Sequence, residues 1–258
     1  YGSISLIITS DEEGKAINGT KKVVEWLINK SEKISGCIVG EPTNVNQMGD
    51  TIEIGRRGSF TGSLTVKGVQ GHVGYPDLAE NPINSLLKML EPFSKIYLDK
   101  GTNEFQPSSV MVTTIDVNND ASNVIPGEVK AKFNIRFNTL HSVASLKSML
   151  KNQFDAITKN YEFDYFCNAE PFLTSDEELK STLQNAITKV VNVNPDKSTT
   201  GGTSDARFIT KLCPVIEFGL VGKTMHKIDE NVEVEDIMKL TNIYNKFLHN
   251  YFRVEKND

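Results

Sequence analysis

Acidic and histidine side chains follow several apolar stretches of this sequence, and these residue types could bind a metal ion. Glu12 and Glu13 come directly after an apolar run near the start of the chain. Glu41 and His226 follow two further apolar runs. Adjacent carboxylates repel each other, so a bound cation or a raised pKa would relieve the repulsion. Oxygen and nitrogen ligands at the ends of separate strands are what a zinc hydrolase requires.

The first apolar run, residues 3–9, is rich in β-branched residues and predicts a buried strand. A helical pattern of apolar residues follows over 15–30. Acids at the carboxyl end of such a strand lie where open α/β sheets place their chemistry. The same acids could instead belong to the first turn of the following helix, whose dipole favours negative charge. The local sequence leaves both interpretations open.

Arginines and glycines elsewhere in the chain are suited to binding a carboxylate. Arg57, next to Arg56, and Arg136 could each bind a carboxylate through two hydrogen bonds. Gly202 and Thr203 lie in a Gly-Gly-Thr-Ser-Asp segment at the start of a predicted helix, where backbone amides and a hydroxyl can hold an anion. A solvated turn, a salt-bridged arginine and a capped helix are the structural alternatives.

The order of these motifs resembles that of the dizinc amidohydrolases of the aminoacylase and carboxypeptidase superfamily. The matching segments extend over nearly the whole chain and comprise 10–14, 40–43, 55–59, 71–76, 79–82, 123–126, 201–205 and His226. The resemblance implies hydrolysis of a linear amide. The branch that matches best cleaves N-succinyl-LL-2,6-diaminopimelate to succinate and LL-2,6-diaminopimelate, in lysine and cell-wall precursor synthesis.

The resemblance also implies roles for individual side chains. Glu12 would be the general base, since water bound to metal needs a nearby carboxylate that is not itself coordinated. His72 of the partner subunit would stabilise the oxyanion, although alone it would pass for a turn histidine. The expected metal ligands are Glu13, Glu41 and His226, and the expected substrate contacts are Arg57, Tyr75, Asn123, Arg136, Gly202 and Thr203. Two zinc ions are expected per full-length subunit, and cobalt or manganese would also suit these ligands.

Two ligands of the family pattern, a histidine and the aspartate that bridges the ions, come before the strand with which this chain begins. The sequence contains neither, and it starts with Tyr1 instead of a methionine. We therefore expect an amino-terminal segment to be missing. Because zinc sites normally use three or four protein ligands, we expect this chain alone to be close to inactive.

The pattern of elements predicts an α/β fold with two domains. A zinc-peptidase-like catalytic domain, incomplete at its amino end, is expected over 1–56 and 169–258, with strands at 37–39 and 215–218 and helices at 176–192, 204–212 and 233–252. Strands are expected from 51 to 66, broken at 55–58, where the chain passes into an inserted α+β ferredoxin-like domain. This domain is expected over 57–168, with further strands at 110–117, 129–137 and 161–167 and helices at 81–99 and 142–158. We expect this inserted domain to mediate a homodimer.

Composition narrows the class of protein. The 258 residues carry a net charge of -5, which argues against binding to nucleic acid or to an anionic membrane. The small-molecule substrate is what the resemblance implies. No apolar run approaches the ~20 residues that span a bilayer. Three cysteines without metal-type spacing favour reduced thiols and a cytoplasmic protein.

Two other functions remain open at this stage. A sister deacylase resembling acetylornithine deacetylase, or a dizinc carboxypeptidase, would share the same metal ligands. A non-catalytic piece that only dimerises or binds a ligand would account for the absent histidine and aspartate.

Overall fold

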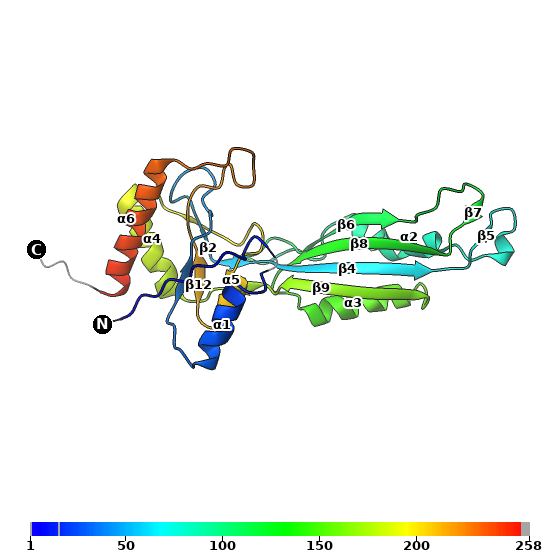
Figure 1. The fold of residues 1–258 in the computed structure, drawn as a ribbon, viewed down its shortest axis with the longest axis horizontal. Coiled ribbons are helices and arrows are strands. Elements are labelled where there is room, and N and C mark those ends of the chain that lie inside the picture. Colours follow the sequence, from blue (N-terminus) through cyan, green and yellow to red (C-terminus); the bar gives the residue numbers. More distant parts are fainter. Residues whose placement is uncertain (1, 15, 254–258) are drawn as a thin grey trace, which may run out of the picture. The chain divides into compact units, whose positions relative to one another are not determined.

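The computed structural model describes residues 2–14 and 16–253 and divides the chain into two compact units. Unit 1 combines the segment up to Arg56 with the segment from Phe172 onward, and unit 2 is Arg57–Pro171. Figure 1 labels many of their helices and strands and colours the chain from its amino end to its carboxyl end. Among the described residues, no helix is long and apolar enough to cross a membrane.

Unit 1 is built on a small mixed sheet. Its order is β1-β12-β2-β11, formed by Cys37–Val39, Val215–Glu217, Thr51–Glu53 and Asp196–Ser198. β1 runs parallel to β12, β2 is antiparallel to β12, and β11 is parallel to β2. A separate antiparallel pair joins β3, Gly55–Arg56, to β10, Phe172–Leu173. The short strands therefore bring segments far apart in sequence to one sheet.

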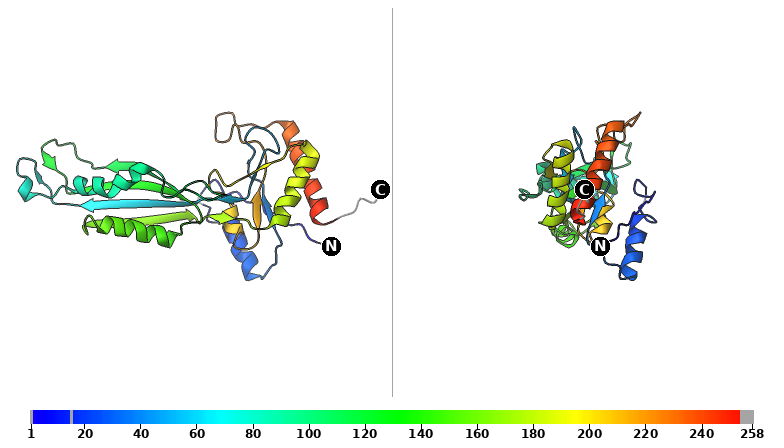
Figure 2. Two further views of the ribbon diagram at one scale, coloured as in Figure 1. Left: turned by 180° about the vertical axis from the view of Figure 1, so that it is seen from behind. Right: turned by 90° about the vertical axis from the view of Figure 1, so that its left-hand side faces the viewer.

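Four helices accompany this sheet: α1, α4, α5 and α6, at Thr20–Asn29, Glu177–Val191, Ala206–Ile209 and Val234–Tyr251. Asp176 caps α4, since its side chain accepts a hydrogen bond from the backbone N–H of Leu179. Helices α4 and α6 lie side by side in Figures 1 and 2. Their apolar faces share a core with Ile52, Ile216 and Phe218 of the sheet region.

The predicted strand over 3–9 is wrong, because the segment has no strand assignment in the structure. Leu6 and Ile8 are 85% and 88% exposed, so their side chains are not buried by a neighbour. A strand needs partners for its backbone groups as well as apolar side chains. The following helix also begins later than predicted, at Thr20, because the Asp11 side chain instead accepts the backbone N–H groups of Ile17 and Asn18.

Unit 2 contains a four-stranded antiparallel sheet in the order β6-β8-β4-β9. These strands are Ser109–Asp116, Glu128–Phe137, Gly58–Lys67 and Tyr161–Ala169. With α2 at Pro82–Leu90 and α3 at Val143–Asp155, the chain order is strand, helix, two strands, helix, strand. That order is the one of a ferredoxin-like module. The unit also contains a second antiparallel pair, formed by β5 at Gly71–His72 and β7 at Val124–Ile125. It contains two 3-10 helices as well, η1 at Pro76–Leu78 and η2 at Glu91–Lys95.

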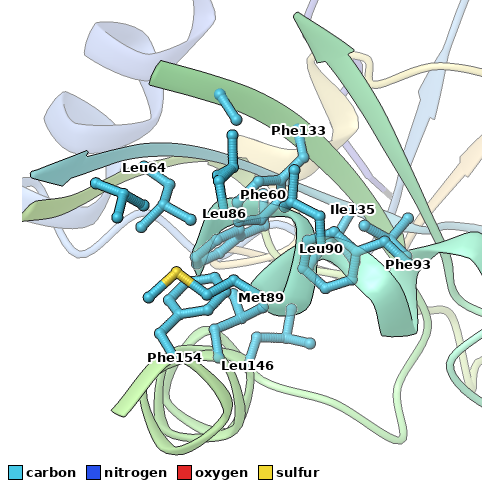
Figure 3. Packing of buried hydrophobic residues seen from close by; sticks show 14 of the residues in the cluster. Phe60, Leu64, Leu86, Met89, Leu90, Phe93, Phe133, Ile135, Leu146 and Phe154 are labelled. Atoms are coloured by element: carbon cyan, nitrogen blue, oxygen red, sulfur yellow. The ribbon is translucent and has the colours of Figure 1, made fainter. Parts of the chain in front are cut away.

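One face of the unit 2 sheet is apolar and carries both helices. Along β4 and β8 alternate side chains are buried, as the two-residue period of a strand dictates. Figure 3 shows Phe60, Leu64 and Phe133 of the strands packed against Met89 of α2 and Phe154 of α3. The opposite face therefore carries the polar side chains of these strands, including Arg136.

Two predicted helices are shorter in the structure. The helix expected over 81–99 begins as predicted, with Asn81 as its cap and Pro82 in its first turn, but ends at Leu90 and continues as η2. Pro92 lacks an N–H, and this favours the change of helix type. The helix expected over 204–212 is limited to α5, a single turn.

Candidate active site

The acidic turn at 11–13 separates its two glutamates. Asp11 fixes the turn, because its carboxylate accepts the N–H of Ile17 at 2.6 Å and that of Asn18 at 2.9 Å. Glu12 is half-buried, whereas the Glu13 side chain is 77% exposed. The two acids thus occupy different environments, as a base and a ligand on adjacent residues would require.

Glu13 lies beside the histidine predicted to share its metal ion. The Nε2 atom of His226 is 3.9 Å from Oε1 of Glu13. His226 has a positive φ of 60°, in a loop whose ends are joined by hydrogen bonds between Thr224 and Asn231 of 2.7 and 3.0 Å. The structure therefore brings together two predicted ligands that are more than 200 residues apart in the sequence.

Glu41 lies just beyond β1, in an environment that disfavours a negative charge. Burial raises its pKa to about 7, and the nearby charges of Glu217, Glu12 and Asp205 add to the shift, with Arg56 opposing it. Burial also raises the pKa of Glu12, with Glu13 the next contributor. The acids at this edge of unit 1 therefore lack enough positive charge around them.

Three residues of this region were not assigned a role from the sequence. Glu217, at the end of β12, is fully buried. Asp205 is 7% exposed and its Oδ1 has no hydrogen-bond partner, and the same holds for the buried Nε of Arg207. Arg207 lowers the pKa of Glu12, although burial and the surrounding acids outweigh it. An acid inside the apolar run 215–218 was the one signal in the sequence that pointed to Glu217.

These side chains fit a metal ion in part. Carboxylates and an imidazole are suitable zinc ligands, and the raised pKa of Glu41 together with the orphaned oxygen of Asp205 indicates a shortage of positive charge. However, no group of three or more ligand residues is close enough to hold an ion within the part of the chain that the structure describes. Glu13 and His226 form one pair of ligands, and Glu41 stands apart from it as a third.

The glycine-rich turn has one constrained and one open position. Gly201 has a φ of +80°, and a side chain there would collide with the guanidinium of Arg56. Gly202 is exposed, and a Cβ atom at this position would meet nothing within 4 Å. Arg56 itself is bonded to Glu217 and to the Thr200 carbonyl, so its guanidinium is already occupied.

In unit 2, the β5–β7 pair brings His72, Tyr75 and Asn123 together. The N–H of Val73 donates to the Asn123 carbonyl at 3.0 Å, and the rings of His72 and Tyr75 are 5.7 Å apart. The N–H of Gly74 donates to Nδ1 of His72 at 3.0 Å. Because Nδ1 acts as the acceptor, a neutral His72 carries its proton on Nε2 and can donate it to an oxyanion.

Arg57 and Arg136 also lie near each other in unit 2. Burial lowers the pKa of Arg136, and the positive charge of Arg57 lowers it further. The Nη1 of Arg57 reaches the Pro107 carbonyl at 3.4 Å, while its buried Nε has no partner. Neither guanidinium forms an ion pair with an acid among the residues described. Two like charges held together in this way favour an anion between them.

Glu41 and Glu217 lie at or just beyond the ends of β1 and β12, Glu13 and His226 form a separate pair, and a ferredoxin-like unit is inserted in the same chain. This combination is typical of metallopeptidase-like α/β proteins. The model of peptidase family M20/M25/M40 matches residues 1–250, and the chain belongs to this family. Curated relatives include the succinyl-diaminopimelate desuccinylases of Pelagibacter ubique (strain HTCC1062), at 55% identity, and of Parvibaculum lavamentivorans, at 50%. Each alignment covers 97% of this chain, and 66% and 65% of the respective relative. The chain thus spans about two thirds of the length of the curated relatives it matches.

Solved structures show the same fold at low sequence identity. The aminopeptidase PepT from Bacillus cereus has a TM-score of 0.75 at 15% identity, covering 94% of this chain and 63% of the peptidase. An M20 family metallo-carboxypeptidase, Sso-CP2 from Sulfolobus solfataricus, has a TM-score of 0.72 at 16% identity, with coverages of 93% and 68%. The prediction of a zinc-peptidase-like α/β fold is confirmed by these similarities. A metal cofactor is in keeping with the family.

Proposed function

We propose that the protein hydrolyses N-succinyl-LL-2,6-diaminopimelate to succinate and LL-2,6-diaminopimelate, as a cytoplasmic homodimer with two metal ions per subunit. Relatives at 49–55% identity are named for this activity. The structural observation that supports this choice of substrate is the Arg57–Arg136 pair, which has no acidic partner in the described chain. A succinyl group presents a free carboxylate that such a pair would bind through several hydrogen bonds.

In this proposal Glu13, Glu41 and His226 hold metal, together with ligands not found among the described residues. Zinc fits these ligands, and cobalt or manganese would be alternatives. A bound ion would lower the pKa of water and polarise the scissile carbonyl. Other ligands would complete each site, since three or four are usual.

The chain's own residues would handle the proton and the substrate's charges. Glu12 would accept the proton of the attacking water and transfer it to the leaving amine nitrogen, and burial favours this role because it raises the pKa of Glu12 and so strengthens it as a base. His72 would donate its Nε2 proton to the oxyanion in the active site of the partner subunit. Tyr75 and Asn123 would contact the same substrate, and Gly202 and Thr203 would bind a carboxylate of it.

The dimer is proposed to form through the inserted domain, over 57–168. Its outer strands β6 and β9 each have one neighbour in the sheet, which leaves an edge of backbone groups on each. Such an edge can pair with a second copy about a two-fold axis. This arrangement would supply His72 from one subunit to the metal ligands of the other.

A substrate comparison tests the proposal. The enzyme, produced at the length of its relatives and loaded with zinc, is assayed with N-succinyl-LL-2,6-diaminopimelate, with N-acetylornithine and with a dipeptide. The proposal expects the highest kcat/KM for the succinyl substrate, because only its acyl group carries a carboxylate for Arg57 and Arg136. A preference for N-acetylornithine would indicate a sister deacylase, and a preference for the dipeptide would indicate a carboxypeptidase.

For this chain by itself, a role in dimerisation or ligand binding alone is the second candidate. The observation that favours it is the lack of any three-ligand group in the described ranges, 2–14 and 16–253. Turnover by the chain alone in the presence of zinc would eliminate this candidate.

A further inference from the structure

The glycine-rich turn at 200–204 is held at both ends by side chains from two strands. At one end, Nη1 of Arg56 donates to the Thr200 carbonyl at 2.6 Å. At the other end, the Ser204 hydroxyl donates to Oε1 of Glu217. The same hydroxyl accepts the Ala206 N–H at 3.3 Å, at the start of α5. The turn is therefore fastened to β3 and to β12 of unit 1.

Arg56 and Glu217 also hold each other. Nε of Arg56 donates to Oε2 of Glu217 at 2.9 Å, and Nη2 donates to the same oxygen. The two carboxylate oxygens of Glu217 are thus divided between Arg56 and Ser204. Glu217 is completely buried and the Arg56 side chain is 12% exposed, so this arrangement is shielded from water and salt.

The part of the turn between the two attachments remains open. Gly202 is exposed and Thr203 is half-buried, whereas Ser204 is only 3% exposed. Gly201 packs so closely on Arg56 that only glycine fits there. The fixed ends surround a short stretch of backbone that a ligand can approach.

We propose that Arg56 and Glu217 are positioning residues that fix the conformation of the turn and hold Gly202 and Thr203 ready for a substrate carboxylate. The part of this proposal that concerns the substrate carboxylate rests on the proposed function. A buried ion pair adds little stability over well-packed apolar residues, so its value lies in orientation. Preorganised donors are effective because they need no rearrangement when the substrate binds.

The direct test observes the turn itself. The chain has 18 glycines, and selective ¹⁵N-glycine labelling gives a simple spectrum in which Gly202 is assigned by substitution and Gly201 by its sequential connection to Gly202. We expect Glu217→Gln and Ser204→Ala to shift or broaden the signals of both glycines, and Arg56→Lys to do so as well, because lysine cannot reproduce the forked contact. Ser181→Ala is the matched control, since Ser181 is exposed on α4 and its hydroxyl donates to the Glu178 carbonyl of the same helix.

Ser204→Ala keeps the test decisive if Glu217→Gln fails to fold, because it removes one hydroxyl and leaves the ion pair in place. Unchanged Gly201 and Gly202 signals in Ser204→Ala and Arg56→Lys, at wild-type dispersion elsewhere, would overturn the proposal. In the zinc-loaded enzyme we further expect Ser204→Ala and Arg56→Lys to lower kcat/KM for the succinyl substrate by up to about 100-fold, mainly through a higher KM. If the succinyl substrate is not hydrolysed at all, the proposed function fails, while the spectra still decide on the turn.

Discussion

The two units of the chain carry opposite imbalances of charge at their candidate sites. In unit 1, burial and neighbouring acids raise the pKa of Glu41 to about 7, and Arg56 only partly offsets them. In unit 2, Arg57 and Arg136 repel each other and burial lowers the pKa of Arg136. No acid pairs with either arginine in the described part of the chain. The candidate site of unit 1 therefore lacks positive charge, and the candidate site of unit 2 lacks negative charge.

The difference assigns a different kind of ligand to each unit. A cation would relieve the acids of unit 1, and an anion such as a carboxylate would relieve the arginines of unit 2. Leaving such groups uncompensated costs folding free energy, so proteins keep them mainly where they have a function. A metal-dependent hydrolase that acts on an acidic substrate needs both ligands at once.

The largest expected effect comes from removing one acid from unit 1 without removing a ligand. In the zinc-loaded enzyme at the length of its relatives, Glu12→Gln should retain the metal and lower kcat by ~100- to 10,000-fold, because only proton transfer is lost. Steady-state kinetics and elemental analysis measure the two quantities. Glu13→Gln is the comparison, since it should lose metal as well. Wild-type turnover in Glu12→Gln would show that another group is the base.

Mixing two inactive variants tests whether the units of different subunits cooperate. Glu12→Gln and His72→Ala, combined at equal concentration, form heterodimers in about half of the dimers, each with one intact site. Activity should then recover to roughly a quarter of wild type. If His72 acts within its own chain, every site remains impaired and mixing restores nothing.

The arginine side of the comparison predicts a smaller and selective loss. Arg136→Ala should lower kcat/KM for the succinyl substrate by the equivalent of roughly 1.5–3 kcal/mol, the range for hydrogen bonds to charged groups. A substrate whose acyl group lacks the distal carboxylate should be affected far less. Lys132→Ala is the matched control, because Lys132 lies on the same face of β8 and is exposed. Equal losses on both substrates would make Arg136 a structural residue.

The smallest expected effect comes from Asp99, an acid of unit 2 whose carboxylate is well supplied with hydrogen-bond donors. Burial tends to raise the pKa of Asp99, but hydrogen bonds from Ser108, Gly101 and Asn138 outweigh it, and the pKa lies below its usual value. The Nε2 of His141 is also 3.1 Å from this carboxylate. Its partners therefore stabilise the ionised form, in contrast to Glu41.

A lowered pKa means that the unfolded chain binds more protons than the folded protein between the two pKa values. The stabilisation by Asp99 is therefore present above the unfolded pKa of about 3.9 and is lost as the pH falls through the folded value. Asp99→Asn should lower the free energy of unfolding by on the order of 1–3 kcal/mol at pH 7, and by much less near pH 2. Urea unfolding at both pH values measures this, with exposed Asp77→Asn as the control. A difference that stays constant with pH would contradict the assignment.

Much of the fold follows from local patterns in the sequence. The two-residue alternation of β4, the helical spacing of α6 and the Asn-Pro start of α2 were sufficient to predict these elements. The strand expected over 3–9 was not formed, because an apolar pattern does not supply the neighbouring strand that its backbone needs. α5 begins later than predicted, because Ser204 and Asp205 belong to the turn before it.

The candidate site was harder to predict where neighbours in sequence have different roles. Arg56 and Arg57 are adjacent, yet the first binds Glu217 in unit 1 and the second belongs to unit 2 with Arg136. Successive side chains of extended backbone point in opposite directions, and sequence alone does not say which faces the site. The partners of Glu217 were likewise hidden, since they come from segments far apart along the chain.

Zinc binding by this chain tests most directly the claim that unit 1 carries an incomplete metal site. Isothermal titration with zinc, checked by elemental analysis, is compared for wild type, Glu13→Gln and Glu25→Gln, the last being an exposed acid on α1. We predict well under two ions per chain, weaker binding in Glu13→Gln and unchanged binding in Glu25→Gln, because one ligand pair and a separate acid hold zinc poorly. Tight binding of two ions per chain, indifferent to Glu13→Gln, would contradict the account.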